Sequence, residues 1–563
     1  MKKTRRLLAI VAAIFITASL SAANDMNIIP LSSPLYDYVD TLYTLEGHAA
    51  AQGARPWTEA DFRQQLSRIE PSSPAAGELY DVILSSIGNE DNKVSVSWNL
   101  SLNPGIAYHT NPENFDEGNQ WISQVLNDKL IETEFGLYAS DWFAVSMGLS
   151  LGFTNATNDY GTRDKHFIDA DNEYRFKEDF ATNIPFVSAG DIDVDVTDHN
   201  FISVGTPYFS LSLGRGQLSL GNGAMGNLIL GNTLPYHDYL SLSAGTNSFF
   251  DYTMLMSFFT HPMNYYQGFD DGPVHGIQFF LAHRFEFRFL ADKVRLTLNE
   301  AIMYQSEDNT IDFRVFNPLL IMHGYYIPAN ANSLASLELE ISPLKSLQLY
   351  FSFAIDDLAV GEKKAPEDGS TLNMWGVMGG LRLAMPVSSS VFTFNFETVY
   401  TSPFMYHKDS YGSADYSLDY VGSVRDNMGK NYIRRYLSFP FGSDALAGLL
   451  RFSFSKPLDY EISISLFAML HGITDENSIA KIYGDDTSDE VPGFITSENP
   501  FDPSETGEPS ITFASSFAGK YYLMDNLQIG AGVDLIYVFN QDNILGNNQF
   551  DTQLTVSINY CIF

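Results

Sequence analysis

The stretch GIQFFLAHRFEFRFLADKVRLTLNE, residues Gly276–Glu300, decides how the rest of the chain is interpreted. Every second position from Ile277 to Phe289 is apolar or aromatic, with His283 as the exception. A period of two predicts a β-strand, because successive side chains of a strand point to opposite faces. Ala291-Asp292 then makes a short turn into a second alternating run. The other face of this hairpin is polar and carries Arg284, Glu286, Arg288, Arg295, Thr297 and Asn299.

Such a hairpin fits two classes of protein. In a soluble β-sandwich the apolar face meets a core and the charged face meets water, whereas in a membrane barrel the apolar face meets lipid and the charged face meets the lumen. The same alternation recurs in 143–153, 347–355, 527–539 and 554–562, over lengths of about 10 residues that suit tilted membrane crossings. We therefore predict an all-β fold, a transmembrane antiparallel β-barrel.

The connections between these runs support the barrel. Short turns near 140–141, 291–292, 343–344, 386–387, 457 and 524–525 alternate with long connections, as in outer-membrane barrels. Counting the runs gives about 18 crossings, an even number as such barrels require. The predicted crossings are 93–102, 127–138, 141–153, 201–213, 216–230, 238–246, 248–260, 274–290, 293–303, 333–342, 346–357, 372–385, 389–400, 446–456, 458–471, 510–522, 525–539 and 549–563.

The first residues follow a different pattern. A basic start, an apolar run and the small residues Ser21-Ala22-Ala23 predict that residues 1–23 are a signal peptide. Residues 24–92 are predicted to form a small helical segment on the periplasmic side, and residues 93–563 the outer-membrane barrel with long acidic extracellular loops. Three helix starts are expected, at Ser33-Pro34, at a capping box of Thr58 and Asp61, and at Ser73-Pro74.

The chain is strongly acidic. Its formal charge is -36, and loss of the four basic residues within 1–23 would make it -40. This charge repels phosphate, so we expect no nucleic-acid partner. The segment 472–509 carries ten acidic residues against Lys481 alone, which leaves divalent-cation binding at these loops open; we predict no other cofactor and no metal site. Cys561 is the only cysteine, so no intrachain disulfide can form.

Two interpretations of the charged hairpin face remain open. Its side chains form either a salt-bridge ladder on the lumen wall or a ligand surface, because guanidinium forks and carboxylates hydrogen-bond sugar hydroxyls well. Glu300 is out of step with Arg295, Thr297 and Asn299, which predicts a β-bulge. We expect Arg284→Ala to leave assembly intact and to change only binding.

Short motifs occur in a fixed order between about residues 205 and 360. They are Gly214-Arg215, Gly226–Asn232, Ala282–Phe287, Asn299–Ala301, Phe316–Leu319 and Asp356-Asp357. Their order and spacing resemble the capsule-assembly Wzi family. The helical start and the predicted strand count agree with this resemblance.

The resemblance implies an 18-stranded barrel in the cell outer membrane that binds or anchors surface polysaccharide without enzymatic activity. It implies that residues 316–326 help to block the lumen. The partners would be a surface polysaccharide and outer-membrane lipid, and we expect a monomer. The candidate ligand-binding residues are Arg284, Glu286, Arg288, Arg295, Asn299, Glu300 and Asn317.

Two other functions stay open at this point. A barrel of this size can enclose a water-filled lumen, so the protein could be a porin or substrate channel. Long loops could also serve a surface adhesin that contacts host or matrix. The sequence contains no nucleophile elbow and no HExxH motif, so we predict no enzyme. Conductance separates the first two functions, because a plugged binding protein should be nearly silent.

Overall fold

The computed structural model describes the barrel strands and the segment that precedes them. The described residues are 25–87, 94–111, 114–115, 129–154, 180–184, 191–196, 199–245, 249–259, 277–306, 309–320, 331–357, 374–403, 405–407, 419–426, 431–472 and 508–562. The predicted signal peptide, residues 1–23, lies outside them and stays a prediction.

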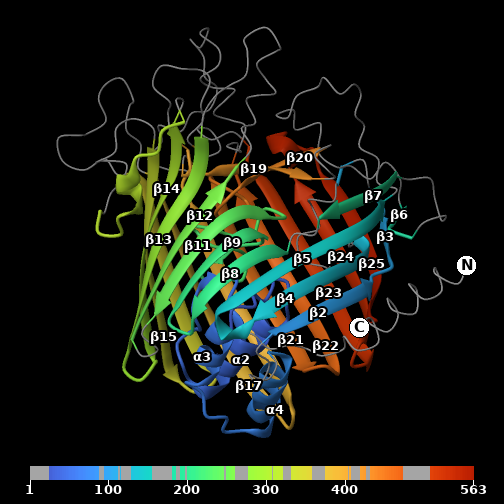
Figure 1. Cartoon of the computed structure of the whole chain (residues 1–563). Helices are drawn as coiled ribbons and strands as arrows, with labels where there is room; N and C mark the ends of the chain where they lie inside the picture. Colours follow the sequence, from blue (N-terminus) through green and yellow to red (C-terminus); the bar gives the residue numbers. More distant parts are fainter. Residues whose placement is uncertain are drawn as a thin grey trace, which may run out of the picture.

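The strands close into one antiparallel barrel of 18 crossings, with helices at one end (Figure 1). β2 and β3 share the first crossing, which is interrupted at Asn103-Pro104, and β7 and β8 share another. The short strand β6 forms an antiparallel pair with β3. The barrel strands are β2 (Val94–Leu102), β3 (Gly105–His109), β4 (Lys129–Ala139), β5 (Phe143–Thr154), β6 (Phe180–Thr182), β7 (Asp191–Val196), β8 (Asn200–Thr206), β9 (Phe209–Gly216), β11 (His237–Gly245), β12 (Phe250–Phe258), β13 (Ile277–Phe289), β14 (Val294–Ser306), β15 (Ala331–Leu344), β16 (Leu347–Asp357), β17 (Met374–Val387), β18 (Ser390–Thr401), β21 (Ala445–Lys456), β22 (Tyr460–His471), β23 (Ser510–Met524), β24 (Leu527–Phe539) and β25 (Gln549–Cys561).

The predicted number of crossings is confirmed, but two individual assignments are wrong. The predicted crossing 201–213 is a hairpin of two crossings, β8 and β9, joined by a turn at Pro207-Tyr208. The predicted crossing 216–230 does not span the wall; apart from the two-residue strand β10 (Ser219–Leu220) it is irregular. The backbone at Gly221 and Gly226 has φ of 128° and 132°, which a continuous strand excludes.

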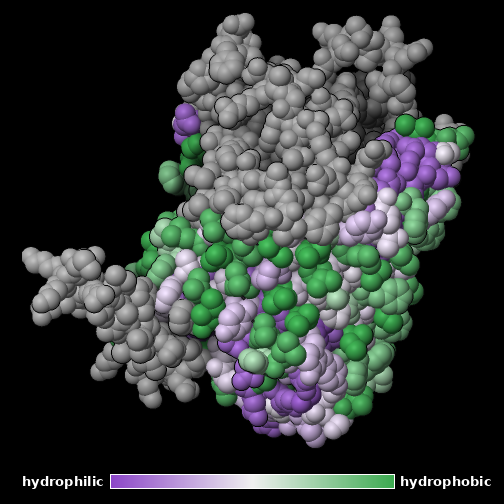
Figure 2. Space-filling model, turned by 90° about the vertical axis from the view of Figure 1, so that its right-hand side faces the viewer, coloured by the Kyte–Doolittle hydropathy of each residue, from purple (hydrophilic) through white to green (hydrophobic). Residues whose placement is uncertain are grey.

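The outer face of the barrel is apolar, as the alternation predicted. Leu535, Phe517 and Ile462 are 39%, 47% and 58% exposed, while the polar neighbours Asp534 and Ser516 point inward and are buried. On the side that Figure 2 presents, many hydrophobic residues lie across the middle of the described wall, and hydrophilic residues gather at its lower end and in a patch at its upper right. A closed barrel leaves no strand edge unpaired, which a bilayer requires. The protein is therefore an outer-membrane barrel.

Three helices precede the barrel, as predicted: α2 (Leu35–Glu46), α3 (Glu59–Leu66) and α4 (Pro74–Ser86). The Thr58–Asp61 capping box has both of its hydrogen bonds, and Ser73 caps α4 through the backbone N–H of Ala76. At α2 the expected cap is shifted, because Pro34 takes the cap position and forms no side-chain cap bond. Within the described part of the chain, no helix has the length and apolar character needed to cross a bilayer.

The helices identify the periplasmic end of the barrel. The backbone N–H of Ala49 donates to the carbonyl of Asp292 at 2.6 Å, and the N–H of Ser346 donates to the carbonyl of Thr44 at 2.8 Å. Both partners belong to short turns, so the helices cover the short-turn end. Ala384 and Val391 of the wall complete the core of the helical segment.

Lysine substitutions at two depths in the membrane should test whether the apolar face of β13 contacts lipid. Phe285 lies half-buried on the outer face of β13, and Leu290 is exposed in the turn that follows. We expect Phe285→Lys to destabilise the barrel by about 2–4 kcal/mol and Leu290→Lys by about 0–1 kcal/mol, because a charge costs most at mid-membrane depth. Folding titrations in lipid vesicles measure both values. Equal effects of the two substitutions would refute the assignment.

Candidate functional site inside the barrel

Three segments fill the lumen. Residues 217–236, 419–426 and 431–444 belong to connections at the extracellular end and fold inward; we call them the lumen plug. Residues 48–55 of the N-terminal segment enter from the periplasmic end; we call them the N-terminal clasp. The two meet where β1 (Ala54–Arg55) of the clasp pairs with β10 of the plug. The plug also contains the hairpin β19 (Val421–Asp426) and β20 (Asn431–Tyr436), visible between the barrel strands in Figure 1.

The plug packs against the wall as an apolar core. One cluster of buried side chains joins plug residues such as Leu228, Leu234 and Phe439 to inward-facing residues of every crossing from β11 to β24. Buried tyrosines add directional contacts: the Tyr420 hydroxyl donates to the carbonyls of Ala301 at 2.9 Å and Asn332 at 2.8 Å. This part of the lumen is packed like a protein interior.

The two halves of the plug are also hydrogen-bonded to each other. The N–H of Gly231 donates to the carbonyl of Leu437 at 2.7 Å, and the Ser438 hydroxyl donates to the carbonyl of Ile229 at 2.9 Å. The backbone could not approach this closely around a larger residue, since a Cβ on Gly231 would lie 2.2 Å from the carbonyl oxygen of Ser438. Close packing thus explains why Gly231 of the Gly226–Asn232 motif is a glycine.

A carboxylate of the wall holds the turn at the tip of the first plug segment. Glu397 on β18 is fully buried and accepts the backbone N–H groups of Ala224 at 2.6 Å and Met225 at 2.7 Å. The Tyr350 hydroxyl donates to the same carboxylate at 2.7 Å. Arg382 donates to the carbonyl of Asn222 beside it. Three hydrogen bonds between the wall and this turn, all of them to charged side chains, make the turn a fixed part of the barrel.

Below the plug, the charged residues of β13 form a buried ion network with β14 and β15. Arg284 makes a bidentate pair with Glu338, both bonds at 2.9 Å, and contacts Glu286 at 2.5 Å. Arg295 pairs with Glu340 at 2.6 Å and with Glu286 at 3.3 Å. The side chains of Arg284 and Arg295 are 1% and 0% exposed.

The N-terminal clasp provides additional hydrogen-bond partners for the charged side chains of β13 and β14. Arg288 lies directly opposite Arg295 in the β13–β14 register, and such like-charge pairs are destabilising. Arg288 donates to the carbonyl of Ala50 at 3.3 Å, and Arg295 donates to the carbonyl of Ala51. The N–H of Gly53 donates to Glu286 at 3.0 Å. The network therefore holds the clasp inside the barrel.

The structure brings together most of the predicted ligand-binding residues. Arg284, Glu286, Arg288, Arg295 and Asn299 are buried in the network. They contact one another, the clasp and the inward-facing wall residues Asp251, Ser336, Glu338 and Glu340. This arrangement matches the ladder interpretation, extended by the clasp. A ligand would have to replace these contacts, and its binding here stays a prediction.

Two other predictions about this region are wrong. The β13–β14 and β14–β15 registers are continuous at Glu300, so no bulge occurs there, and Glu300 faces outward opposite His283. Residues 309–320, which include η5 (Phe313–Phe316), lie on the outer wall against Met256, Leu281 and Ile302. Asn317 is therefore outside the lumen, and residues 316–320 do not block it. Residues 321–326 lie outside the described part of the chain.

Sequence reasoning missed the partners of this network. Glu338 and Glu340 share parity with Ser336 on β15, and this signal could have placed them on the inner face. The sequence contains no such signal for Asp251, Glu397 or the clasp. They come close to their partners only because the barrel closes and because parts of the chain fold into the lumen.

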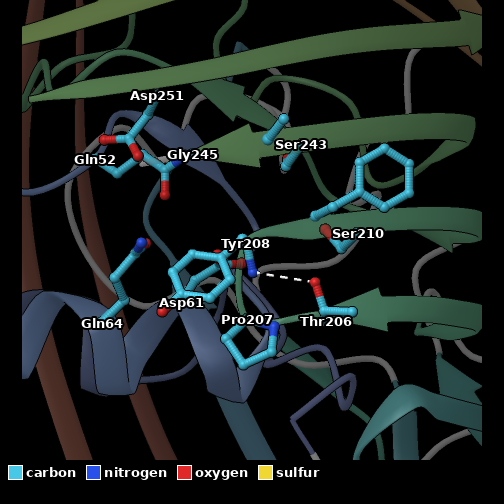
Figure 3. Close-up of a pocket in the computed structure, with 12 residues that line it drawn as sticks. Gln52, Asp61, Gln64, Thr206, Pro207, Tyr208, Ser210, Ser243, Gly245 and Asp251 are labelled. Carbon is cyan, nitrogen blue, oxygen red and sulfur yellow. Dashed lines mark hydrogen bonds between the residues drawn. The ribbon is translucent and has the colours of Figure 1, made fainter. Parts of the chain in front are cut away.

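A small polar pocket lies at the periplasmic rim, between α3 and the ends of β8, β9, β11 and β12 (Figure 3). Gln52, Asp61, Gln64, Tyr208 and Asp251 are among the residues that line it. The side-chain nitrogen of Gln64 is buried and has no hydrogen-bond partner among the described residues. A water molecule bridging these groups would fit the site.

The proposed cation sites lie mostly beyond what the structure describes. Residues 473–507, which carry nearly all of the acidic residues of the 472–509 segment, are outside the described ranges. Among the residues that are described, no three His, Cys, Asp or Glu side chains are grouped to hold a metal ion. Cation binding at the acidic loops stays a prediction.

The clasp should loosen at mildly acidic pH. Burial lowers the pKa of His48, with Arg288 and Lys345 contributing in the same direction against Asp292 and Glu46. The folded state thus binds a proton less readily than the unfolded state, so stability should fall as the pH drops below about 6.5. Urea unfolding of the N-terminal segment at pH 7.5 and 5.5, followed by the fluorescence of buried Trp57, measures the loss. His48→Gln should flatten this dependence; an unchanged slope would contradict the assignment.

Comparisons with known proteins agree on the fold. No family model matches the chain, and no match was found among curated proteins. Among solved structures, the chain is similar to Wzi of Escherichia coli, described as an outer-membrane carbohydrate-binding β-barrel involved in group 1 capsule assembly, at 10% identity and a TM-score of 0.56. The match covers 94% of this chain and 99% of that chain.

Porin-type barrels match less closely. OccAB4 of Acinetobacter baumannii has 10% identity and a TM-score of 0.39, covering 84% of this chain and 99% of that chain. OprD of Pseudomonas aeruginosa has 12% identity and a TM-score of 0.36, covering 83% and 96%. The fold of this chain is thus an outer-membrane β-barrel similar to that of Wzi, and the resemblance expected from the sequence is confirmed at the level of the fold.

Proposed function

We propose that this outer-membrane barrel binds surface polysaccharide at its extracellular side and is not an enzyme. The observation that carries the proposal is the packed lumen plug. A diffusion channel needs a continuous water-filled path. Here an apolar cluster joins the plug to every crossing from β11 to β24, and the N-terminal clasp fills the space below it. A barrel filled in this way serves as a rigid platform for its extracellular loops.

Polysaccharide is the ligand class that the fold comparison favours. The carbohydrate binding in the description of Wzi belongs to that protein and is extended to this chain only as a proposal. The net charge of -36 would repel an acidic polysaccharide. We therefore propose that divalent cations bridge the acidic loops and an acidic glycan, which fits the oxygen ligands that Ca²⁺ prefers.

The test is calorimetry of the refolded full chain with purified surface polysaccharide from the host strain. We expect saturable binding in the presence of Ca²⁺ and weaker binding after chelation with EDTA. A neutral polysaccharide bound equally well under both conditions would refute the cation bridge alone. Absence of binding to any surface glycan of the strain would refute the proposed function and favour the adhesin alternative.

A further inference from the structure

We infer that residues 309–320 form a strap embedded in the outer leaflet of the membrane, with lipid acyl chains as its partner. The strap connects to the extracellular end of β14 and lies against the lipid-facing wall, to the left of β13 in Figure 1. This inference does not depend on the proposed glycan binding.

The first observation is the patch of wall that the strap covers. Met256, Leu281 and Ile302 face outward, yet they are at most 2% exposed. Leu298, on the same face of β14 closer to the periplasm, is 44% exposed. Ile311, Val315 and Phe316 of the strap pack against the covered patch. The strap thus replaces lipid as the neighbour of this part of the wall.

The second observation is a polar cluster beneath the strap. His283 is the only outward residue of β13 that is not apolar, and Glu300 lies directly opposite it on β14. The Nε2 atom of His283 lies 2.8 Å from the carbonyl oxygen of Val315, and Nδ1 lies 2.8 Å from the Tyr252 hydroxyl. A carbonyl only accepts, so Nε2 donates to Val315, and in the neutral imidazole Nδ1 then accepts from the Tyr252 hydroxyl. The strap therefore completes the hydrogen bonding of a histidine that would otherwise face acyl chains.

The third observation is that the strap satisfies most of its own backbone donors. The backbone N–H of Asp312 donates to the Tyr304 hydroxyl oxygen, and Asp312 accepts the N–H groups of Arg314 and Val315. Asn317 accepts the N–H groups of Leu319 and Leu320 in the same way. Backbone groups without partners are costly next to hydrocarbon, so a segment built like this can lie there.

The height of the strap agrees with a lipid environment. His283 lies six residues from each end of β13. At about 3.3 Å per residue, with the strand tilted, this is close to the middle of an apolar band about 25 Å tall. Phe313 and Leu319 are 79% and 83% exposed, and they extend the apolar outer surface of the barrel. Arg314 is held in a bidentate pair with Asp312, which keeps its charge neutralised near the acyl chains.

The experiment places a fluorophore on the strap and measures its contact with lipid. Cys561, the only cysteine, is replaced by serine, and Phe313→Cys and Leu319→Cys are labelled separately in the full chain in nanodiscs. Leu298→Cys serves as the lipid-facing control and Leu84→Cys on α4 as the aqueous control. Resistance to unfolding in SDS without heating shows that each variant has folded.

Lipids brominated on their acyl chains should quench labels at 313 and 319 as strongly as the label at 298. Iodide in the buffer should quench only the label at 84. Quenching of both strap labels by iodide and not by brominated lipid would overturn the inference. Disulfide formation between copies of the unlabelled Leu319→Cys variant under an added oxidant, together with no quenching of the label at 319 by lipid, would instead identify the strap as a contact between two barrels and would equally overturn the inference.

Discussion

Replacement of residues 218–235 by a flexible glycine–serine linker should convert the barrel into an open pore. These residues supply Leu228, Ile229, Leu230 and Leu234 to the core that joins the plug to the wall. Their loss also removes the N–H of Gly231, which donates to the carbonyl of Leu437 in the second half of the plug, and the carbonyl of Leu228, which accepts from the Tyr406 hydroxyl. A barrel of this strand number without a filling should leave an aqueous channel. Sugars of increasing size in liposome-swelling assays would measure its width.

The matched control changes a connection at the same end of the barrel that does not enter the lumen. Residues 541–547 join β24 to β25, and their side chains, Ile544 and Leu545 among them, are largely exposed. The same linker there should leave liposomes impermeable. Impermeable liposomes with the plug-replaced, folded protein would show that other parts of the chain close the lumen. Swelling with the control would show that the linker itself makes the barrel leaky.

Arg284→Ala should cost about 3–5 kcal/mol of stability, because it leaves Glu286 and Glu338 buried with lost partners. This expectation replaces the one drawn from the sequence, in which the substitution left assembly intact and changed only binding. The clasp should loosen as well, since Glu286 holds the N–H of Gly53. Urea midpoints measure the stability, and thermolysin cleavage within residues 48–55 measures release of the clasp.

Lys456→Ala is the control for this substitution. Lys456 also links the barrel to the helical segment, since it pairs with Asp459 at 3.0 Å and Glu78 at 3.7 Å, but these side chains are 30–40% exposed. Water screens such exposed pairs and they contribute little to stability, so the clasp should stay protected. Equal effects of the two substitutions would mean that the buried network adds little stability. The ligand interpretation of Arg284 would then regain its support.

The outer face of the barrel could be predicted from the sequence because the bilayer imposes one rule on every crossing. Residues that contact lipid, such as Leu535 and Phe517, must be apolar. This requirement produces an alternation of apolar and polar residues that is visible within each strand. The helix starts at Thr58 and Ser73 were predictable for a similar reason. A cap needs only residues within one turn of each other.

The plug could not be predicted, because the same pattern of apolar side chains occurs whether they contact lipid or a packed lumen. Leu218, Leu220, Leu228 and Leu230 have the parity of a lipid-facing strand, but all four are buried inside the barrel. Glu300 caused the opposite error. It broke the polar parity of the inner face, and a local rule could interpret that only as a bulge. The strap that covers the outer wall beside it is a contact that sequence spacing does not contain.

Plug and clasp together should block ion flow through the lumen, and single-channel recording on the unmodified chain in planar bilayers measures that flow. We expect a nearly silent membrane at all voltages at which the bilayer is stable, with insertion verified by protease protection. Steady, ohmic current steps that scale with the number of inserted barrels would contradict it. Such current steps would identify the protein as a channel.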